Sequence, residues 1–254
     1  MNSLKKTTHF GQKTVALEDK QAMVNAVFDG VASRYDLMND LMSGGVHRIW
    51  KDIMVTALSP PKQGKLAYNV LDMAGGSGDI ARRIIEASFG HANVMVSDIN
   101  EEMLAVGKER AKSWRYPEQV NFKQADAQEL PFDDESFDAY TISFGIRNVP
   151  QVDLALKEAF RVLKRGGRFL CLEFSNVDVP LLDKIYEKFS HSLIPAIGQA
   201  VADDKDSYQY LIESIEQFPT AEKFTNMISD AGFSRVSHTP LTGNIAALHS
   251  AWKL

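Results

Sequence analysis

The chain has 254 residues, of which 44% are hydrophobic and 24% charged, and its net charge at pH 7 is −5. This composition is typical of a globular protein, and the negative charge argues against nucleic acid as a partner, because phosphate binding needs a basic face. No run of about 18 apolar residues predicts a membrane span, and the first fifteen residues lack the apolar core of a secretory signal. We therefore expect a cytoplasmic protein with one domain and an elaboration.

The first sixty-five residues show no strand alternation, and we expect them to form a helical cap (residues 1–65). One apolar stripe at helical spacing runs from Ala22 to Val31. The segment SRYDLMNDLMSGGVHRIWKD, from Ser33, is rich in polar and aromatic residues and indicates either the wall of a site or a solvated helix face. A second stripe, which Pro60 and Pro61 end, consists of Leu37, Leu41, Ile49, Ile53 and Leu58.

From Leu66 onward, strands alternate with helices. This rhythm predicts an α/β fold over residues 66–254: a Rossmann-like, mostly parallel sheet of seven strands with helices on both faces. The stretch VLDMAGGSGD, from Val70 to Asp79, predicts a strand, a glycine turn and a helix. Glycines let a ligand approach the backbone, and the N-terminus of the helix offers unpaired amides. The turn is therefore the expected binding site.

Two cofactors match this turn by pattern. The run from Gly76 to Ala81 satisfies G-x-G-x-x-A, and Asp98 follows where a dinucleotide site has its ribose-binding acid. Asp72 and Asp79, however, would repel a pyrophosphate at this helix N-terminus, whereas S-adenosylmethionine brings a sulfonium and an ammonium there. The charges favour S-adenosylmethionine over NAD, and an ordinary glycine turn is the third interpretation.

Two further acids end strands of the predicted sheet. Asp98 follows the strand Asn93–Ser97 and can accept both hydroxyls of a ribose, whichever cofactor binds. Asp126 follows the strand Val120–Gln124, where its carboxylate can accept a hydrogen bond from an adenine amino group while the Ala127 amide meets a ring nitrogen. An ordinary turn aspartate is the alternative for Asp126.

The next units continue the alternation. The strand Phe137–Phe144 brings Ser143 and Arg147 to the edge where open α/β sheets bind ligands. A helix from Val152 to Lys164 follows, and then a fifth strand that ends at Glu173. Asn100 and Thr220 are the expected N-caps of two other helices of the sheet.

The C-terminal part departs from the alternation. Residues 176–219 predict a helical insertion, and two closing strands near 234–238 and 243–249 predict an antiparallel hairpin at or near the edge of the sheet. We expect the last segment, 243–254, to form a paired edge. Cys171, the only cysteine, is expected to be buried and reduced.

Together these features resemble class I S-adenosylmethionine-dependent methyltransferases, and more narrowly the ubiquinone/menaquinone biosynthesis C-methyltransferase family. The resemblance covers nearly the whole length, and its long blocks from Val31 and Ile142 are more specific than the glycine turn. The matching segments are TTHFG from Thr7, VASRYDLMNDLMSGGVHRIWKD from Val31, LDMAGGSGD from Leu71, SDINEEML from Ser97, ISFGIRNV from Ile142, FRVLKRGGRFLCLEFS from Phe160 and DSYQYLIESI from Asp206.

The resemblance implies a reaction and a set of cofactor contacts. Members of the family methylate a ring carbon of a polyprenylated benzoquinol or naphthoquinol, and no metal is required. The departure from the family pattern is small: Ser77 stands where threonine is frequent, which keeps the hydroxyl. The resemblance assigns cofactor binding to Asp72, Gly76, Ser77, Asp98, Asp126, Ala127 and Ser143.

An aromatic carbon attacks a methyl group readily once a neighbouring phenol has lost its proton. The site must therefore favour a phenolate and align two reactants about 3 Å apart. Arg147 is the candidate for stabilising the phenolate, because a guanidinium stays protonated; it could instead relay the proton through a water. Its structural alternative is an ion pair with an acid such as Asp36. Tyr35 and Asn148 are the candidates for positioning the ring.

The polyprenyl tail of such a substrate needs an apolar surface, which the insertion offers, although the same spacing is typical of core packing. We expect this cap to open onto a membrane, so that the enzyme docks peripherally at its inner face or within a quinone-synthesis complex. The family resemblance also suggests a homodimer. The apolar residues of the insertion are Tyr186, Phe189, Leu193, Ile194, Ile197 and Val201.

Two other functions compete with a methyltransferase. A short-chain dehydrogenase would need Tyr-x-x-x-Lys, and none of the seven tyrosines has a lysine four residues later. A non-catalytic S-adenosylmethionine-binding scaffold of a quinone-synthesis complex is compatible with the same motifs. The sequence also does not separate a benzoquinol from a naphthoquinol head group.

Overall fold

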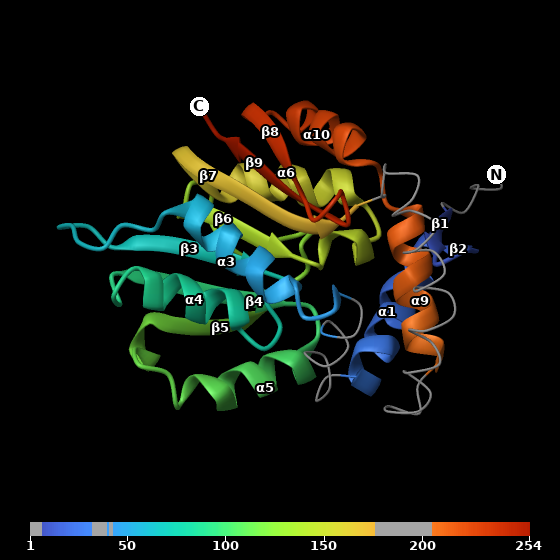
Figure 1. Ribbon diagram of the computed structural model, residues 1–254, viewed down its shortest axis with the longest axis horizontal. Helices are drawn as coiled ribbons and strands as arrows, with labels where there is room; N and C mark the ends of the chain where they lie inside the picture. The colour runs from blue at the N-terminus through green and yellow to red at the C-terminus, as the bar shows by residue number, and fades with distance from the viewer. Residues whose placement is uncertain (1–6, 32–39, 41–42, 176–204) are drawn as a thin grey trace.

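The computed structural model describes residues 7–31, 40, 43–175 and 205–254. Its main sheet has seven strands in the order β5-β4-β3-β6-β7-β9-β8 (Figure 1). This confirms the predicted Rossmann-like, mostly parallel sheet. The strands are β3 Tyr68–Met73, β4 Ala92–Asp98, β5 Val120–Gln124, β6 Phe137–Ser143, β7 Leu163–Phe174, β8 Ser234–Leu241 and β9 Ala246–Trp252.

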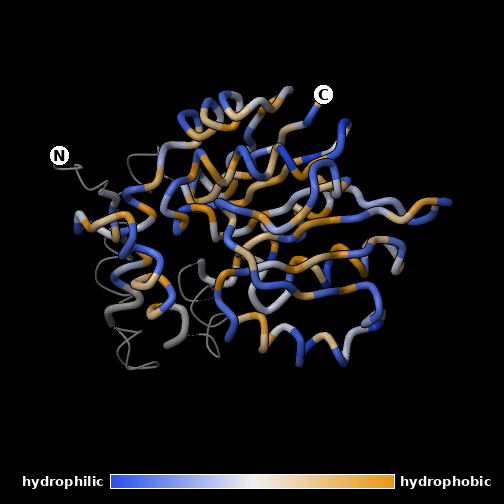
Figure 2. The backbone as a smooth tube through the Cα atoms, turned by 180° about the vertical axis from the view of Figure 1, so that it is seen from behind, coloured by the Kyte–Doolittle hydropathy of each residue, from blue (hydrophilic) through white to orange (hydrophobic). Residues whose placement is uncertain are grey.

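Amphipathic helices cover both faces of this sheet (Figure 1). Hydrophilic and hydrophobic residues alternate along α5, as expected of a helix with one buried side (Figure 2). The two predicted N-caps are confirmed: Asn100 accepts a hydrogen bond from the Met103 amide, and Thr220 accepts one from the Lys223 amide. The helices on the two faces are α3 His47–Leu58, α4 Asp79–Ala87, α5 Glu101–Ala111, α6 Val152–Val162 and α10 Ala221–Asp230, and α9 (Lys205–Gln217) lies apart from them.

Strand β3 shows how the sheet separates two hydrophobic cores. Its successive side chains point to opposite faces. Val70 belongs to the core that contains side chains of α3 and α4, while Leu71 and Met73 belong to the core that contains those of α6 and α10. Because both faces are covered, the second half of the strand is mostly apolar. Asp72, which is only 1% exposed, is the buried polar exception, whereas Asn69, nearer the start of the strand, is half-buried.

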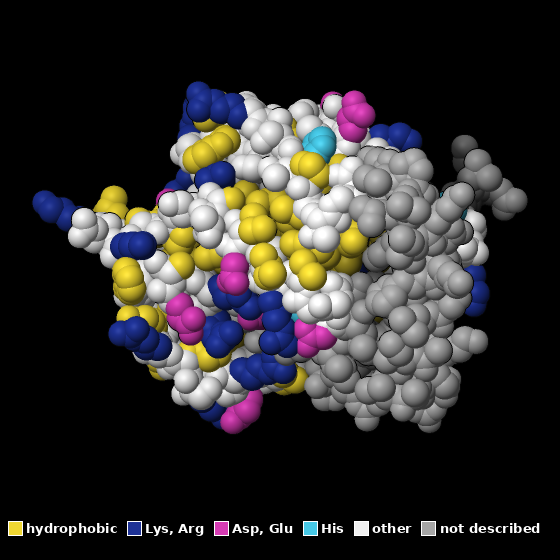
Figure 3. Space-filling view, viewed as in Figure 1, with side chains coloured by type: hydrophobic (Ala, Val, Ile, Leu, Met, Phe, Trp, Pro, Cys, Tyr) yellow, Lys and Arg dark blue, Asp and Glu magenta, His cyan; other side chains and the backbone are white. Residues whose placement is uncertain are grey.

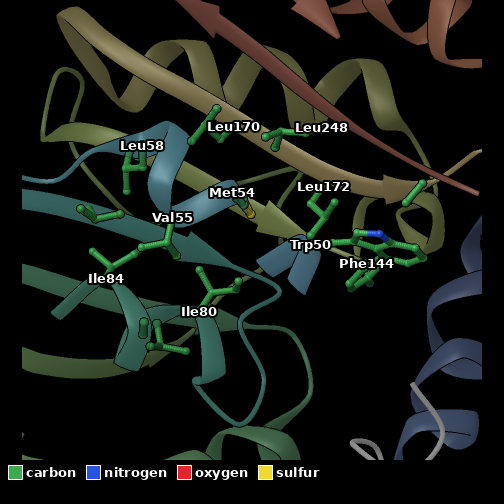
Figure 4. Close-up of a cluster of buried hydrophobic side chains, with 14 of the residues drawn as sticks. Trp50, Met54, Val55, Leu58, Ile80, Ile84, Phe144, Leu170, Leu172 and Leu248 are labelled. Carbon is green, nitrogen blue, oxygen red and sulfur yellow. The ribbon is translucent and has the colours of Figure 1, made fainter. Parts of the chain in front are cut away.

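Helix α3 packs into the first core through a face that shares only Leu58 with the predicted stripe, while Leu37 and Leu41 of that stripe lie outside the described residues. Trp50 and Met54 are buried, and the Trp50 ring lies 6.3 Å from that of Phe144 (Figure 4). Ile49 and Ile53 are 60% and 37% exposed, so the predicted stripe is wrong at these positions. Both faces have the same spacing, and the face with the large indole is the buried one because it removes more apolar area from water.

The N-terminal residues contain a hairpin that the sequence analysis missed. β1 (Thr7–Phe10) pairs antiparallel with β2 (Lys13–Ala16). The expectation of no strands before residue 65 is therefore wrong. Strands of four residues are too short to show alternation, and the only local signal is Gly11, whose φ of +57° suits the first central position of a two-residue turn.

Helix α1 (Leu17–Val31) follows the hairpin and confirms the predicted helix. Among residues 17–27 of this helix, whose burial is described, Lys20 and Val24 are buried, whereas Ala22 and Ala26 of the predicted stripe are exposed. Helices α1 and α9 lie side by side beyond the carboxyl ends of the parallel strands (Figure 1). The division of the chain into a cap and a catalytic domain near residue 65 stays a prediction.

The C-terminal hairpin is present, but its edge differs from the one expected. β9 pairs antiparallel with β7 on one side and with β8 on the other. The segment 243–254 is therefore an inner strand, and the expectation of a paired edge there is wrong. β8 is the edge strand, because the chain returns past β8 to insert β9 into the sheet. Cys171, on β7, is buried and free, as predicted.

Candidate functional site

A cleft opens at the carboxyl ends of β3, β4 and β6, where open α/β sheets bind ligands. Its empty space, which includes the open space at the mouth, is about 940 Å³. Helix α1 closes the outer side through Gln21, Val24 and Asn25. The residues predicted to bind the cofactor all line this cleft: Asp72, Gly76, Ser77, Asp98, Asp126, Ala127 and Ser143.

Strand order sets the order of the polar groups along the cleft. β5, β4, β3 and β6 are neighbours in the sheet, so the residues at or just beyond their carboxyl ends follow one another as Asp126, Asp98, Asp72 and Ser143. An elongated ligand lying across this edge meets the groups in that order. Adenine, ribose and methionine are joined in the same order in S-adenosylmethionine.

Asp72 is buried at the floor of the cleft. Its Oδ1 accepts a hydrogen bond of 2.8 Å from the Thr141 hydroxyl, and its Oδ2 has no hydrogen-bond partner among the described residues. Burial raises the pKa of Asp72 to about 7, against the lowering effect of the Thr141 hydrogen bond. A buried carboxylate oxygen without a donor is costly, so a cation beside it would be stabilised.

The glycine turn packs closely around this carboxylate. A Cβ at Gly75 would lie 2.9 Å from the Asp72 Oδ2, so a larger residue would fill the space beside that oxygen. The amide of Gly76 donates a 3.0 Å hydrogen bond to Asp98 Oδ2, and the Asn100 amide donates one of 2.9 Å to Asp98 Oδ1. These bonds fix the Asp98 carboxylate at the wall of the cleft, while burial raises its pKa to about 6.

Asp126 and Ala127 lie at the far end of the cleft from Asp72. Asp126 Oδ1 accepts a hydrogen bond of 2.8 Å from the Gln128 amide, as in an Asx turn. The turn aspartate considered as an alternative is therefore present, and it exposes the same residue to the cleft. Ala127 is buried. The predicted adenine contacts remain a proposal that this position fits.

Two serines contribute hydroxyls to the wall. Ser143, the last residue of β6, has a buried Oγ with no hydrogen-bond partner among the described residues. Ser77 is buried in the glycine turn. The unpartnered Ser143 hydroxyl and the unpartnered Asp72 oxygen both belong to the cleft lining, and they fit a ligand that brings a cationic or donor group.

Asp79, the second acid of the charge argument, is neutralised by the protein. Its Oδ2 accepts a hydrogen bond of 2.9 Å from Lys51 Nζ, and its Oδ1 accepts one of 3.2 Å from Arg83 Nε. Burial would raise the pKa of Asp79, but these two cations lower it to about 2. Asp72 is thus the carboxylate that favours a cation here, and Asp79 contributes less than the sequence argument assumed.

Arg147 is held in a buried ion pair. The short helix η3 (Ile146–Asn148) follows β6. From it, Arg147 Nη1 donates hydrogen bonds of 2.7 Å to Glu173 Oε1 and to the Phe144 carbonyl, and Nε donates one of 3.2 Å to Ser214 Oγ. Within the described residues, Nη2 donates no hydrogen bond.

This ion pair corresponds to the structural alternative for Arg147, with a different acid. The partner is Glu173, at the end of β7, and Asp36 lies outside the described residues. Arg147 does not line the cleft, whereas its neighbours Gly145 and Asn148 do. Arg147 is therefore adjacent in sequence to a residue of the cleft wall, Asn148.

Asn148 is the predicted ring-positioning residue that lies on the cleft. Its Oδ1 accepts a hydrogen bond of 2.9 Å from the Tyr210 hydroxyl of α9, and the Tyr210 ring stacks on Phe10 of β1 with ring centroids 4.2 Å apart. Because the carbonyl oxygen accepts this bond, Nδ2 is the Asn148 atom that can donate a hydrogen bond to a ligand. Sequence reasoning missed Tyr210, whose contact joins residues 62 positions apart.

The remaining predicted residues cannot be placed in the cleft. Tyr35 lies outside the described residues, as do the apolar residues of the insertion from Tyr186 to Val201. Lys51, by contrast, lines the cleft and was missed. The signal available was its position in the HRIWKD block, four residues after His47 on a helix with a buried face.

Comparison with known proteins assigns the family. The sequence matches the ubiE/COQ5 methyltransferase family over residues 14–253. It is 57% identical to the ubiquinone/menaquinone biosynthesis C-methyltransferase UbiE of Rhodopseudomonas palustris (strain BisB5) over 254 residues, 100% of both chains. It is 59% identical to the UbiE of Nitrobacter hamburgensis over 248 residues, 98% of both chains.

A solved structure supports the fold. Phosphoethanolamine N-methyltransferase 2 of Haemonchus contortus, in complex with phosphomonomethylethanolamine and S-adenosylhomocysteine, superposes with a TM-score of 0.61. The match covers 94% of this chain and 59% of that one, at 16% identity. At this identity the likeness concerns the fold alone, whereas the full-length relatives and the family match decide the membership. The chain belongs to the ubiE/COQ5 methyltransferase family.

Proposed function

We propose that this methyltransferase methylates a ring carbon of a polyprenylated quinol: a benzoquinol on the way to ubiquinone, a demethylmenaquinol on the way to menaquinone, or both. The observation that supports this most is the 57% identity over the whole chain to a ubiquinone/menaquinone C-methyltransferase. Its methyl donor is S-adenosylmethionine. Nothing in the comparisons supports the alternative of a non-catalytic scaffold.

The residues of the cleft fit this donor. When bound, S-adenosylmethionine supplies a methyl group on a cationic sulfur. Asp72 provides a carboxylate oxygen for the cationic end, and Ser143 provides a hydroxyl in the same cleft; neither atom has a hydrogen-bond partner among the described residues. We assign the ribose hydroxyls to Asp98, which its two amide contacts hold in place, and the adenine to Asp126 and Ala127. Gly76 and Ser77 form the turn against which the ligand lies.

The acceptor side rests on η3. The ring carbon becomes nucleophilic when its phenol ionises, and a cation lowers the pKa of a nearby phenol. The Arg147 Nη1 and Nε donors are engaged, so Nη2, which donates no hydrogen bond to the residues that the structure describes, is the group proposed to face the quinol oxygen. Asn148 Nδ2 is proposed to donate to the same ring, held by Tyr210. Tyr35 remains a candidate for positioning.

The proposed substrate carries a prenyl tail, so the proposal extends to contact with a membrane. None of the helices in the described ranges is long and apolar enough to cross a membrane. We propose a cytoplasmic protein that docks peripherally on the inner face of the membrane, alone or in a quinone-synthesis complex, with the tail against the predicted insertion, residues 176–219. A homodimer is proposed from the family resemblance alone.

Turnover with radiolabelled S-adenosylmethionine tests the reaction. The purified chain should label a short-chain demethylated benzoquinol, a demethylmenaquinol, or both, and assaying each separately assigns the head group. The product should carry the label on a ring carbon, which mass fragmentation distinguishes from an oxygen methyl group. Absence of label in both acceptors, from protein that binds S-adenosylhomocysteine, would contradict the proposal.

Flotation with liposomes tests the membrane contact separately. Vesicles that contain a long-chain quinone should carry the protein to the top of a density gradient, with and without other proteins of quinone synthesis added. Vesicles without quinone serve as the control. Protein that stays at the bottom under all these conditions would rule out peripheral docking while leaving the reaction untouched.

A further inference from the structure

We propose that Lys51 binds the carboxylate of the cofactor's methionine part, opposite the Asp72 carboxylate that meets its cationic end. S-adenosylmethionine carries one carboxylate, and a buried carboxylate needs a charged or hydrogen-bonding partner. Among the described residues that line the cleft, Lys51 is the one with a cationic side chain. The inference rests on the cleft binding this cofactor and does not depend on the acceptor.

The position of Lys51 is suited to this role. Its side chain reaches from α3 to the first turn of α4 and is only 6% exposed. α4 begins at Asp79, and its N-cap residue, Gly78, has no side chain that could cap the helix. Helix N-termini attract anions. Because Lys51 and Arg83 pair with Asp79, the repulsion that the sequence predicted at this terminus is reduced, and the lysine favours a single carboxylate there. Asp72 lies at the β3 end of the same turn.

The ion pair with Asp79 does not use up Lys51. An ammonium has three donors, and the hydrogen bond to Asp79 Oδ2 occupies one of them. Asp79 has further cationic neighbours, because Arg83 contacts its Oδ1 at 3.2 Å and Arg82 lies 3.7 Å away. Acidic and basic side chains gather on the outer surface over α3 and α4 (Figure 3). Because the two arginines could neutralise Asp79 without Lys51, the ion pair with Asp79 does not by itself explain why Lys51 is buried.

Two ligands distinguish carboxylate binding from a structural role. S-adenosylhomocysteine has the carboxylate, and S-adenosyl-3-thiopropylamine is the same molecule without it. Titration calorimetry gives the dissociation constant of each for the purified full-length chain. The wild type should bind S-adenosylhomocysteine about 10- to 100-fold more tightly, the range of a charge-assisted hydrogen bond. Equal affinity for the two ligands in the wild type would overturn the proposal without any variant.

Lys51→Met should weaken binding of S-adenosylhomocysteine by about 10- to 100-fold and that of the decarboxylated ligand by less than 3-fold. An equal loss for both ligands would mean that Lys51 merely holds the glycine turn, and no loss would mean that it does not meet the cofactor. Either result overturns the proposal. Lys164→Met is the matched control, because Lys164 forms a 2.8 Å pair with Asp138, away from the residues that line the cleft.

Asp79→Asn separates the lysine from its ion pair. If Lys51 binds the ligand, this variant should keep the preference for the carboxylate; if the pair itself matters, it should lose affinity like Lys51→Met. Should Lys51→Met unfold, the double variant with Asp79→Asn removes both charges and takes its place. Because S-adenosylhomocysteine binds without an acceptor, these outcomes are independent of whether the quinol proposal holds.

Discussion

Burial makes ionisation of the Asp72 carboxyl group unfavourable, and a cationic ligand beside it would offset this free-energy cost. In the folded protein its pKa is about 7, raised by burial from 3.8. At a pH between 3.8 and about 7, the Asp72 carboxyl keeps its proton in the folded chain but has lost it in the unfolded chain. The contribution of Asp72 to the free energy of unfolding is therefore fully present below about pH 4 and is lost as the pH rises through 7.

Asp72→Asn should remove this pH dependence. A shift from 3.8 to about 7 corresponds to about 4 kcal/mol. Relative to the wild type, the ligand-free variant should gain up to about 4 kcal/mol in free energy of unfolding between pH 4 and pH 8. Urea denaturation across this range measures it. A difference between the two proteins that does not change with pH would contradict the assignment.

The pair of Arg147 and Glu173 calls for a double substitution. Arg147→Ala alone would leave Glu173 buried and unpaired, which destabilises by roughly 3–5 kcal/mol. Combined with Glu173→Gln, it should leave a folded protein whose affinity for S-adenosylhomocysteine changes less than about 3-fold, while turnover falls at least about 100-fold. The pH at half-maximal turnover should rise by about 1–2 units, because the phenol loses its cation.

Glu173→Gln alone completes this experiment, because it removes the ion pair and keeps the cation. Its turnover should stay above about a tenth of the wild-type value, with an unshifted pH profile. If it loses turnover as fully as the double variant, Arg147 contributes only through the ion pair, and its proposed contact with the phenolate is wrong.

Sequence alone predicted the strand-end acids but not their partners. Asp72, Asp98 and Asp126 follow apolar runs, and parallel strands bring their carboxyl ends to one edge. The bond from Tyr210 to Asn148 and the pair of Lys51 with Asp79 depend on which helices lie over that edge. No periodicity within one segment encodes such contacts.

Helix α5 and the glycine turn approach each other more closely than a side chain would allow. A Cβ at Gly107 would lie 2.9 Å from the Gly76 carbonyl oxygen and 2.7 Å from the Phe122 ring. A contact below 3 Å with backbone forces a shift, so the bare glycine lets α5 support the turn. This is the reason for a buried glycine in the middle of a helix.

Gly107→Ala should weaken S-adenosylhomocysteine binding about 10-fold or more, because the turn that carries Gly76 must move. It should also lower the free energy of unfolding by about 1–3 kcal/mol, although alanine is the better helix former by about 1 kcal/mol. Calorimetry and urea denaturation measure the two effects. Ala105→Gly, at an exposed position of the same helix, is the control and should lower stability without affecting binding.

The elements that were predicted well are the long ones with a strict pattern. The five parallel strands and the helices between them have regular patterns of apolar residues. The N-caps of the helices carry residue-specific signals such as Asn100. β1 and β2 were missed because four residues give too little alternation. The buried face of α3 was misjudged because two stripes have the same spacing, and only packing against Phe144 distinguishes them.

At the level of the molecule, the cleft has two walls with different origins. The sheet and its glycine turn form one wall, and α1 forms the other. The N-terminal hairpin and α9 connect the second wall to the acceptor side: Phe10 stacks on Tyr210, which holds Asn148. The Lys20 ammonium adds a 3.3 Å hydrogen bond to the Val149 carbonyl just after η3. The sequence did not predict these contacts, because they connect residues that are far apart in the chain, such as Phe10 and Tyr210.

Phe10→Ala should loosen this second wall without disturbing the sheet. Losing the stacked ring removes support for Tyr210, so hydrogen exchange should accelerate in β1, β2 and α9, while β3, β4 and β6 keep their protection. Turnover of the quinol should fall about 5- to 10-fold, and S-adenosylhomocysteine affinity should change less than about 2-fold, because Asn148 belongs to the acceptor side.

Phe89→Ala, at a phenylalanine that is 61% exposed, is the matched control and should change none of these. Faster exchange throughout the sheet would show instead that the hairpin stabilises the whole fold, and the separation of the two walls would then be wrong.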